Sequence, residues 1–425
     1  MQNRQYYVVQ DAELIDPVVK EQFGHLLQAR DLAATRDGER YQFVGFIINR
    51  DKVLVSFPKN TFTVQQRLAF QQDPRTLGPY LRMLFQCIKK TSEQRNNKYA
   101  GVLSELDADY PFMAFLSIYR YYTTYGLFTN EREVKKFSYS GRISWKDTIQ
   151  KSPKVVNNSN LLFLPLVVRN NVSEHVFVSK CMAYAIDTTL EHFSLFLEGN
   201  RTGLDTRDID FTNSSLIIAA LRQAKRNMFK DIHLRLIDAL LSFFQQQDLK
   251  GGKHQLKIYS FHMIWENMVG NYLRYNFHMV NERDQLKFSH CSEPKSFQKM
   301  TFYPDIRGQQ GHAIEPDYYW FSSADQVRYI FDAKYYRELH ELDYKQVSYY
   351  FLLKHYGVNR DAEGNITGDI ATYNALLLPT EEEERSIVHF ELNPEYNLDE
   401  ERFIVLAHYL KTIKIMEHYT RVYLG

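Results

Sequence analysis

Residues 315–336, "EPDYYWFSSADQVRYIFDAKYY", predict two β-strands joined by a turn, because the β-rich runs "YYWF" and "VRYIFDAKY" flank the polar "SSADQ". Side chains alternate across a strand, so Asp332 and Lys334 project from the same face of the second strand. Asp317 stands at the start of the first strand, and pairing of the two strands would bring it near Asp332. The stretch therefore predicts two carboxylates and one ammonium group at one point of a sheet.

This arrangement of charges is typical of a metal site. Two carboxylates at one point repel each other and lose hydration, which is tolerable when a cation lies between them. Ligands that offer only oxygen favour Mg²⁺, which keeps several waters and adds one or two carboxylates and a substrate phosphate. We expect Mn²⁺ to substitute. Lys334 would deprotonate or orient a water, or stabilise charge on the phosphate. The alternative is an exposed hairpin with a surface Asp/Lys pair, since D-x-K is a short and frequent pattern.

Two predicted helices favour the metal site. "FHMIWENMVGNYL" (261–273) is an apolar helix with a single acid, Glu266, and an acid on an apolar surface normally needs a partner. "DYKQVSYYFLL" (343–353) places Gln346 and Tyr350 one turn apart, on the same face of a helix. The D-x-K strand leads into this second helix within about ten residues, a connection length usual in α/β domains.

The residues together resemble a known nuclease superfamily. Asp317, then Asp332-Ala-Lys334, with a preceding Glu266 and a following Gln346-xxx-Tyr350, resembles the PD-(D/E)xK nucleases, and the Q-xxx-Y helix is similar to that of RecB-type members. The stretches "HMIWENM", "EPDYYW", "FDAKYY" and "DYKQVSYYF" resemble the LlaJI family of restriction endonucleases. The resemblance extends upstream to the less specific "FVGFIINRDKVLVSFPKN" and "GRISWKDTI".

The resemblance implies a Mg²⁺-dependent DNA endonuclease that cleaves double-stranded DNA in bacterial restriction–modification or anti-phage defence. Asp317, Asp332 and Glu266 would be metal ligands, and Lys334 would be the catalytic lysine. Gln346 and Tyr350 would position the lysine strand or the scissile phosphate.

The resemblance also implies partners. Such enzymes are usually encoded beside a DNA methyltransferase, and relatives similar to McrC work as nuclease subunits with an AAA+ GTPase. This sequence has no G-x-x-x-x-G-K-[ST] loop, so a nucleotide motor would be a separate polypeptide. A non-catalytic DNA-binding or assembly protein is the alternative of another class. Cleavage of both strands suggests at least a transient homodimer, although two sequential nicks would also serve.

A second acid competes for the role of the first metal ligand. "YPD" at 303–305 also fits the Pro-Asp signature and makes Asp305 a rival of Asp317. Asp305 opens onto "RGQQGH", a glycine-containing loop, whereas Asp317 runs directly into the strand expected to pair with 327–335. We therefore favour Asp317.

The pattern along the chain predicts three parts and an α/β fold class. Residues 1–62 form a small β-rich unit, in which 41–57 is a hairpin ended by "PKN". Residues 63–250 form a mainly helical recognition and scaffolding region, with long helices over 173–199 and 214–247. Residues 251–425, after a glycine-containing hinge, alternate strands and helices and end in a helix over 398–420, which predicts an α/β domain. The resemblance implies that this domain is PD-(D/E)xK restriction-endonuclease-like.

A row of cations in the helical region is a candidate DNA-binding surface. These cations are Arg222, Lys225, Arg226 and Lys230. Such a row can follow a phosphate backbone, but a solvated helix face gives the same pattern.

Composition places few limits on function. The chain of 425 residues carries a formal net charge of +1, so a basic nucleic-acid surface must be local. Its apolar runs are too short to cross a membrane, and the polar N-terminus lacks the layout of a secretory signal. The cysteines Cys87, Cys181 and Cys291 show no CxxC spacing, which fits a reducing compartment. We expect a cytoplasmic protein.

Overall fold

The computed structural model describes residues 4–93, 106–157, 160–174, 176–246, 253–357, 370–396 and 402–421. The chain divides into two compact units. Residues 1–109 and 249–425 form the first unit, and residues 110–248 form the second. The second unit is therefore an insertion in the sequence of the first.

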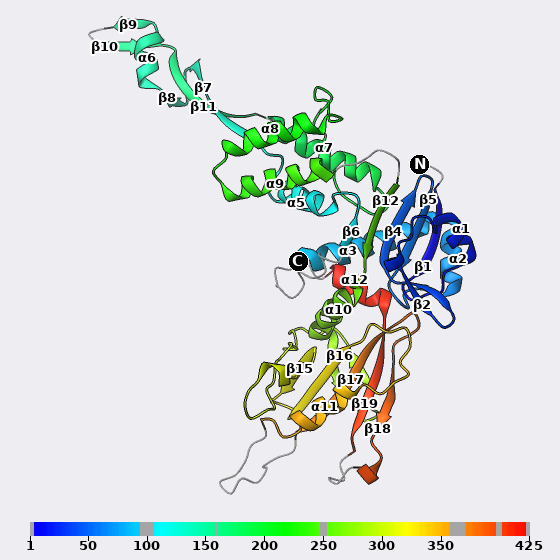
Figure 1. Ribbon diagram of the computed structural model, residues 1–425. Coiled ribbons are helices and arrows are strands. Elements are labelled where there is room, and N and C mark those ends of the chain that lie inside the picture. The colour runs from blue at the N-terminus through cyan, green and yellow to red at the C-terminus, as the bar shows by residue number, and fades with distance from the viewer. Residues whose placement is uncertain are drawn as a thin grey trace, which may run out of the picture. The chain divides into compact units, whose positions relative to one another are not determined.

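The first unit contains an N-terminal five-stranded sheet in the order β1-β5-β4-β12-β6 (Figure 1). Its strands are β1 (Gln5–Gln10), β4 (Val44–Asn49), β5 (Lys52–Phe57), β6 (Leu106–Ala108) and β12 (Lys253–Ile258). β1 and β5 are parallel, and the other neighbours are antiparallel. The predicted hairpin at 41–57 is confirmed as β4 and β5, which pair from Gly45↔Ser56 to Asn49↔Lys52.

Short elements surround this sheet. They are α1 (Pro17–Phe23), η1 (Ala29–Asp31), the hairpin β2 (Leu32–Thr35) and β3 (Gly38–Tyr41), α2 (Val64–Gln72), η2 (Pro74–Leu77) and α3 (Gly78–Glu93). Lys257 of β12 and Asp31 form an ion pair of 2.6 Å with both side chains fully buried. Tyr259 adds a hydrogen bond of 2.6 Å to the same carboxylate.

A second sheet of the first unit has the order β15-β16-β17-β19-β18 (Figure 1). Its strands are β15 (Tyr318–Ser322), β16 (Val327–Ala333), β17 (Ala371–Thr380), β18 (Arg385–Glu391) and β19 (Ile404–Lys411). The three central strands are parallel, and both edge strands are antiparallel. Buried runs such as "ALLLPT" in β17 agree with a sheet that is covered on both faces.

Three helices and several small elements accompany this sheet. The helices are α10 (Phe261–Asn276), α11 (Tyr344–Leu353) and α12 (Thr412–Arg421), and the small elements are β13 (Phe277–Val280), β14 (Leu286–Phe288), η4 (Gln310–His312) and η5 (Pro394–Tyr396). α11 covers the face that holds Ile330, where Tyr349 and Leu353 pack. Phe277, directly after α10, packs on Phe331 from the opposite face, with ring centroids 5.4 Å apart. The two helices therefore lie on opposite faces of β16.

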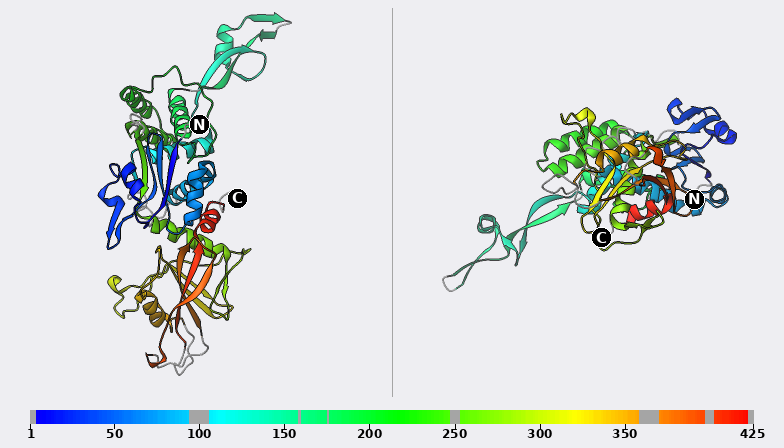
Figure 2. Two further views of the ribbon diagram at one scale, coloured as in Figure 1. Left: turned by 90° about the vertical axis from the view of Figure 1, so that its right-hand side faces the viewer. Right: turned by 90° about the horizontal axis from the view of Figure 1, so that it is seen from below.

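The second unit consists of helices and a long β-ribbon (Figure 2). The helices are α5 (Phe112–Tyr125), α7 (Phe177–His192), α8 (Ser214–Arg226) and α9 (Asp231–Gln246). The ribbon pairs β7 (Asn130–Ser138) with β11 (Leu166–Glu174), and it also carries β8 (Arg142–Ile143), α6 (Trp145–Lys151), β9 (Lys154–Asn157) and β10 (Asn160–Phe163).

The three-part division expected from the sequence differs from this arrangement. β12 lies beyond the boundary placed at 250, yet it pairs with β4 and β6 in the N-terminal sheet. Residues 63–93, assigned to the helical region, likewise belong to the first unit. The hinge marks the end of the second unit, but the chain then completes the N-terminal sheet before it enters α10. The paired glycines at 251–252 themselves lie outside the described residues.

Three predicted helices are also corrected. Residues 173 and 174 belong to strand β11, and the helix after it ends at His192. The helix expected over 214–247 is two helices, because α8 ends at Arg226 and α9 begins at Asp231. The helix expected over 398–420 contains strand β19, whose apolar run "IVLA" lies buried between β17 and β18. No helix within the described ranges has the length and apolar character needed to span a membrane.

Candidate active site

The β15–β16 hairpin brings Asp317 to Asp332, as the sequence predicts. Tyr318 pairs with Phe331, so Asp317 lies opposite Asp332 at the end of the hairpin. The backbone N–H of Asp317 donates to Asp332 Oδ1 at 3.4 Å, and the N–H of Ala333 donates to Asp317 Oδ2 at 3.1 Å. The two carboxylates thus share one end of the sheet.

Side chains of strand β16 and of Lys334 directly after it contact both ends of helix α11. Arg328, Ile330, Asp332 and Lys334 alternate onto the face that α11 covers. The guanidinium of the buried Arg328 donates to the carbonyls of Leu353, Lys354 and Tyr356 at the C-terminal end of α11. Such contacts satisfy the last carbonyls of a helix. At the other end of α11, Lys334 contacts Asp343, the residue directly before the helix.

Lys334 lies between two carboxylates at the start of α11. Its Nζ is 2.5 Å from Asp332 Oδ2 and 3.0 Å from Asp343 Oδ2. Asp343 is also the N-cap of α11, because its side chain accepts the N–H of Gln346 at 3.2 Å. Burial by itself lowers the pKa of Lys334, but the two carboxylates outweigh it and raise that pKa above its ordinary value. Lys334 is therefore a cation in this arrangement.

Helix α10 brings Glu266 to the same end of the sheet. The hydroxyl of Tyr318, next to Asp317, donates to the backbone carbonyl of Glu266. Gly270 makes this approach possible, because a Cβ there would lie 2.9 Å from the Tyr318 ring. Trp265 donates from Nε1 to the carbonyl of Leu377 at 3.4 Å, and Lys334 N–H donates to that same carbonyl at 2.9 Å.

A second lysine balances the acids. Lys299 Nζ lies 3.9 Å from Glu266 Oε1, 3.7 Å from Asp317 Oδ1 and 3.2 Å from Glu315 Oε2. An antiparallel bridge between Gln298 and Tyr319 places Lys299 there. The ammonium group therefore faces carboxylates from α10 and from the segment that leads into β15.

The pKa of Asp317 is raised because the carboxyl group is buried beside other acids. Burial raises this pKa, and the negative charges of Asp332 and Glu266 raise it further, to about 8, although Lys299 opposes them. A carboxyl group that binds a proton so tightly lies where an added cation would be favoured.

These residues fit a divalent ion bound by two carboxylates. Within the part of the chain that the structure describes, no group of three or more His, Cys, Asp or Glu side chains is arranged to hold a metal. Mg²⁺ does not need such a group, because one or two carboxylates, water and substrate phosphate complete its shell. Asp317 and Asp332 meet that requirement. As a further ligand, Glu266 would compete with its ion pair to Lys299 at 3.9 Å.

Gln346 and Tyr350 take different positions. Gln346 is fully buried, and both its amide nitrogen and its amide oxygen lack a hydrogen-bond partner among the described residues. Tyr350 packs in the core with Leu376 and against Phe403, with ring centroids 4.3 Å apart. Its neighbour Tyr349 donates to the carbonyl of Glu315 at 3.2 Å. Burial and the charges of Asp332 and Asp317 raise the pKa of Tyr349.

Asp305, the rival first acid, is held by its own loop. Its carboxylate accepts hydrogen bonds from Arg307 Nε at 3.2 Å and Nη2 at 3.0 Å, and it also contacts His312. Arg307 and His312 lower the pKa of Asp305 to about 2. The structure thus brings Asp317 to Asp332 and gives Asp305 local partners.

The cations proposed for DNA binding lie in the second unit. Arg222, Lys225 and Arg226 belong to α8, and Lys230 precedes α9. Arg222, Arg226 and Lys230 are exposed. Lys225 forms an ion pair with Asp238 of α9, so its charge is partly balanced.

A protein-family model covers the residues of this candidate site. A model described as "LlaJI restriction endonuclease" matches residues 43–391. The chain belongs to the LlaJI restriction endonuclease family. No curated protein matches it. Among solved structures, it is similar to a chain of a refined half-complex from a tetradecameric assembly of Thermococcus gammatolerans McrB AAA+ hexamers with bound McrC. That alignment covers 98% of each chain at 13% identity and a TM-score of 0.37, too low to support an argument about function.

In this member of the LlaJI family, three residues of the site were missed by sequence reasoning. Asp343 precedes α11 as a helix cap, a signal that the sequence does offer. Tyr349 lies three positions after Gln346, so it shares a helix face with it. Lys299 follows no local pattern, because only the pairing of Gln298 with a distant strand places it beside the acids.

Replacing Lys299 by methionine is expected to raise the apparent affinity of this LlaJI-family chain for Mg²⁺ by roughly tenfold, because a cation that competes for Glu266 and Asp317 is removed. A Mg²⁺ titration followed by thermal unfolding measures this affinity. Lys295→Met is the matched control, since the Lys295 ammonium lies 5.2 Å above the Trp320 ring. Weaker Mg²⁺ binding in Lys299→Met would contradict the competition.

Proposed function

We propose that this chain is a Mg²⁺-dependent DNA endonuclease of the PD-(D/E)xK type that acts in restriction–modification or anti-phage defence. The family assignment supports a nuclease. The observation that carries the metal dependence is the meeting of Asp317 and Asp332, with Lys334 bound to Asp332 at 2.5 Å. The sheet order supports a restriction-endonuclease-like domain, because Asp332 ends a strand, β16, that pairs antiparallel with β15 and parallel with β17, and Lys334 follows that strand directly.

In the proposed reaction, a water oxygen forms a bond to phosphorus and the bond from phosphorus to the leaving oxygen breaks. The leaving oxygen takes up a proton, and the attacking water loses one to solvent. A bound Mg²⁺ would polarise the phosphoryl oxygen and favour ionisation of the water. Asp317 and Asp332 would hold that ion, with Glu266 as an additional ligand, directly or through water.

The protonated Lys334 has a narrower role than the sequence alone allows. Since Asp332 and Asp343 keep its ammonium charged, it would orient the water or stabilise the charge that develops on the phosphate. Asp343 would hold Lys334. Gln346, whose buried side-chain amide has no hydrogen-bond partner among the described residues, would position the lysine strand or the scissile phosphate. Tyr350 would support α11 from the core.

The test is cleavage of unmethylated double-stranded phage DNA by the purified chain, with Mg²⁺ and with EDTA. We expect discrete fragments with Mg²⁺ or Mn²⁺ and none with EDTA. A second arm adds GTP and any AAA+ GTPase encoded beside the gene, and cleavage only in that arm would identify the chain as a nuclease subunit. Absence of cleavage in both arms, together with DNA binding, would leave a non-catalytic DNA-binding protein.

A further inference from the structure

Strand β16, which carries Asp332, ends directly before Lys334, so the chain leaves the sheet at that residue. β16 ends at Ala333, and α11 begins only at Tyr344. The N–H of Lys334 still donates to Leu377, but residues 335–343 have no regular secondary structure. A side chain that must be placed within a fraction of an ångström therefore sits at the start of an irregular segment.

A turn of the N-terminal sheet contacts this segment directly. Residues 58–60, "PKN", follow β5, and Lys59 donates twice to Tyr335, the residue after Lys334. The Lys59 N–H donates to the Tyr335 hydroxyl at 2.9 Å, and its Nζ donates to the Tyr335 carbonyl at 3.1 Å. The ammonium also lies 4.4 Å above the Tyr335 ring and 3.8 Å from Asp11 Oδ2. Tyr335 is thus held at both its backbone and its ring.

Asn60 extends the contact to the irregular segment and to strand β17 of the catalytic sheet. Its side-chain Nδ2 donates to the carbonyl of Arg337 at 3.0 Å and to that of Pro379, near the end of β17, at 3.1 Å. Asn60 has φ +52°, in the left-handed region, where asparagine is tolerated better than most residues. That backbone conformation directs one amide group at two carbonyls.

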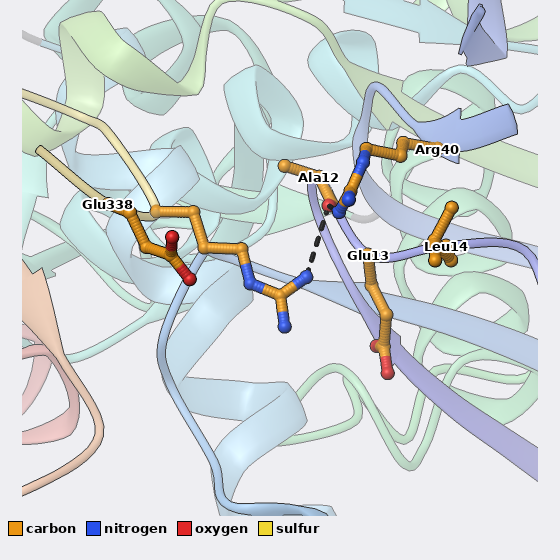
Figure 3. A pocket seen from close by; sticks show the side chains of 6 residues that line it. Ala12, Glu13, Leu14, Arg40 and Glu338 are labelled. Carbon is orange, nitrogen blue, oxygen red and sulfur yellow. Dashed lines mark hydrogen bonds between the residues drawn. The ribbon is translucent and has the colours of Figure 1, made fainter. Parts of the chain in front are cut away.

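The segment is also held from the turn after β1. Arg337 Nη1 donates to the carbonyl of Ala12 at 3.3 Å, and Arg40 Nη1 donates to the same oxygen at 2.9 Å. Figure 3 shows this place as a pocket lined by Ala12, Glu13, Leu14, Arg40, Arg337 and Glu338. Hydrogen bonds from the 58–60 turn and to Ala12 therefore hold residues 335–337, which have no strand partner in the sheet.

We propose that Lys59 and Asn60 are positioning residues for Lys334, through which the N-terminal sheet holds the nuclease site in its active geometry. This inference rests on the proposed function of Lys334. Lys59 and Asn60 touch neither metal nor DNA in this scheme, and they act by fixing Tyr335 and Arg337. A displacement of about 1 Å at a reacting group can cost roughly 100-fold in rate, so a residue in a separate sheet can still control the chemistry.

The test uses single substitutions that leave the backbone of the turn intact. Lys59→Met keeps the N–H donor and the apolar stem but removes the ammonium, and Lys59→Arg restores a cationic donor. Asn60→Gly keeps the left-handed conformation but removes the amide. We expect Lys59→Met and Asn60→Gly each to lower kcat for Mg²⁺-dependent DNA cleavage roughly 10- to 100-fold, with KM for DNA unchanged and with partial recovery in Lys59→Arg.

Lys90→Met is the matched control. Lys90 donates to the backbone carbonyl of Tyr419, and its ammonium lies 4.2 Å above that ring, the same kind of contact as Lys59 makes with Tyr335. We expect Lys90→Met to lower the melting temperature and to leave kcat unchanged. The rise in melting temperature on adding Mg²⁺ should persist in every variant, because the metal carboxylates are intact.

Three results would overturn the inference. Wild-type kcat in Lys59→Met and Asn60→Gly would show that the turn is only a structural joint. Loss of the Mg²⁺-dependent rise in melting temperature along with cleavage would assign the effect to the carboxylates instead of Lys334. If the wild-type chain shows neither cleavage nor a Mg²⁺-dependent rise, the proposed function fails, and the positioning role fails with it.

Discussion

Replacing Lys334 by alanine is expected to lower the rate of DNA cleavage by about 10³-fold or more, because one charged donor aimed at a transition state typically contributes 10²–10³ and this lysine also orders Asp332. The rate is measured in single turnover with excess protein and Mg²⁺. Binding of Mg²⁺ should persist, since Asp317 and Asp332 remain.

The same substitution is expected to destabilise the fold, so a control must separate the two effects. Without Lys334, the buried carboxylate of Asp332 and the partly buried carboxylate of Asp343 lose their shared cation, and breaking a buried pair costs about 3–5 kcal/mol. Lys257→Ala breaks the fully buried pair with Asp31 in the N-terminal sheet, at a comparable cost. We expect Lys257→Ala to retain cleavage at temperatures where it is folded. Cleavage by Lys334→Ala at more than a tenth of the wild-type rate would place the active site elsewhere.

Replacing Asp317 by asparagine is expected to abolish Mg²⁺-dependent cleavage and yet stabilise the metal-free protein at pH 8. The folded-state pKa of Asp317 is raised to about 8 from an ordinary value of 3.8. Between these values the unfolded chain has already released a proton that the folded chain still binds, so stability falls as pH rises through this window. Asparagine does not titrate, so the substitution removes this decrease in the free energy of unfolding, which is on the order of 3 kcal/mol at pH 8.

Thermal unfolding in EDTA at pH 5 and pH 8 measures the effect. The gain in melting temperature should be several degrees at pH 8 and smaller at pH 5, and added Mg²⁺ should stabilise the wild type but not Asp317→Asn. Asp305→Asn is the matched control, because Arg307 and His312 lower the pKa of Asp305 to about 2. A lowered pKa makes the charged form stabilising above its ordinary range, so Asp305→Asn should not raise the melting temperature, and it should retain cleavage. The reverse pattern would make Asp305 the metal ligand.

The sequence predicts the hairpin of the candidate site because its signals are local. Alternation along β16 places Asp332 and Lys334 on one face, and the short turn after Ser322 leaves Asp317 opposite Asp332. The position of Glu266 is less local, since it depends on Gly270 allowing the Tyr318 ring to lie against α10. The role of each of these residues in catalysis stays a prediction.

Other features depend on pairing between distant segments, which one sequence does not display. β12 pairs with β4, some two hundred residues earlier in the chain, and this pairing moves the boundary between units. The run "IVLAHYLK" has the length and apolar content of either a strand or a buried helix turn, and its place between β17 and β18 decides for a strand. Lys299 and the contact of Lys59 with Tyr335 arise in the same way.

The neighbouring positions of β6 and β12 have a consequence for how such proteins diversify. The chain leaves the first unit just after β6 and returns in β12, and these strands pair directly, with Leu256 opposite Ala108. The strands that precede and follow residues 110–248 in the sequence are thus neighbours in the N-terminal sheet. We infer that replacing residues 110–248 by a segment of different length or surface charge would leave the register of β6 and β12 unchanged. If the second unit carries the recognition role expected from the sequence, target preference and cleavage chemistry would be free to evolve at separate rates.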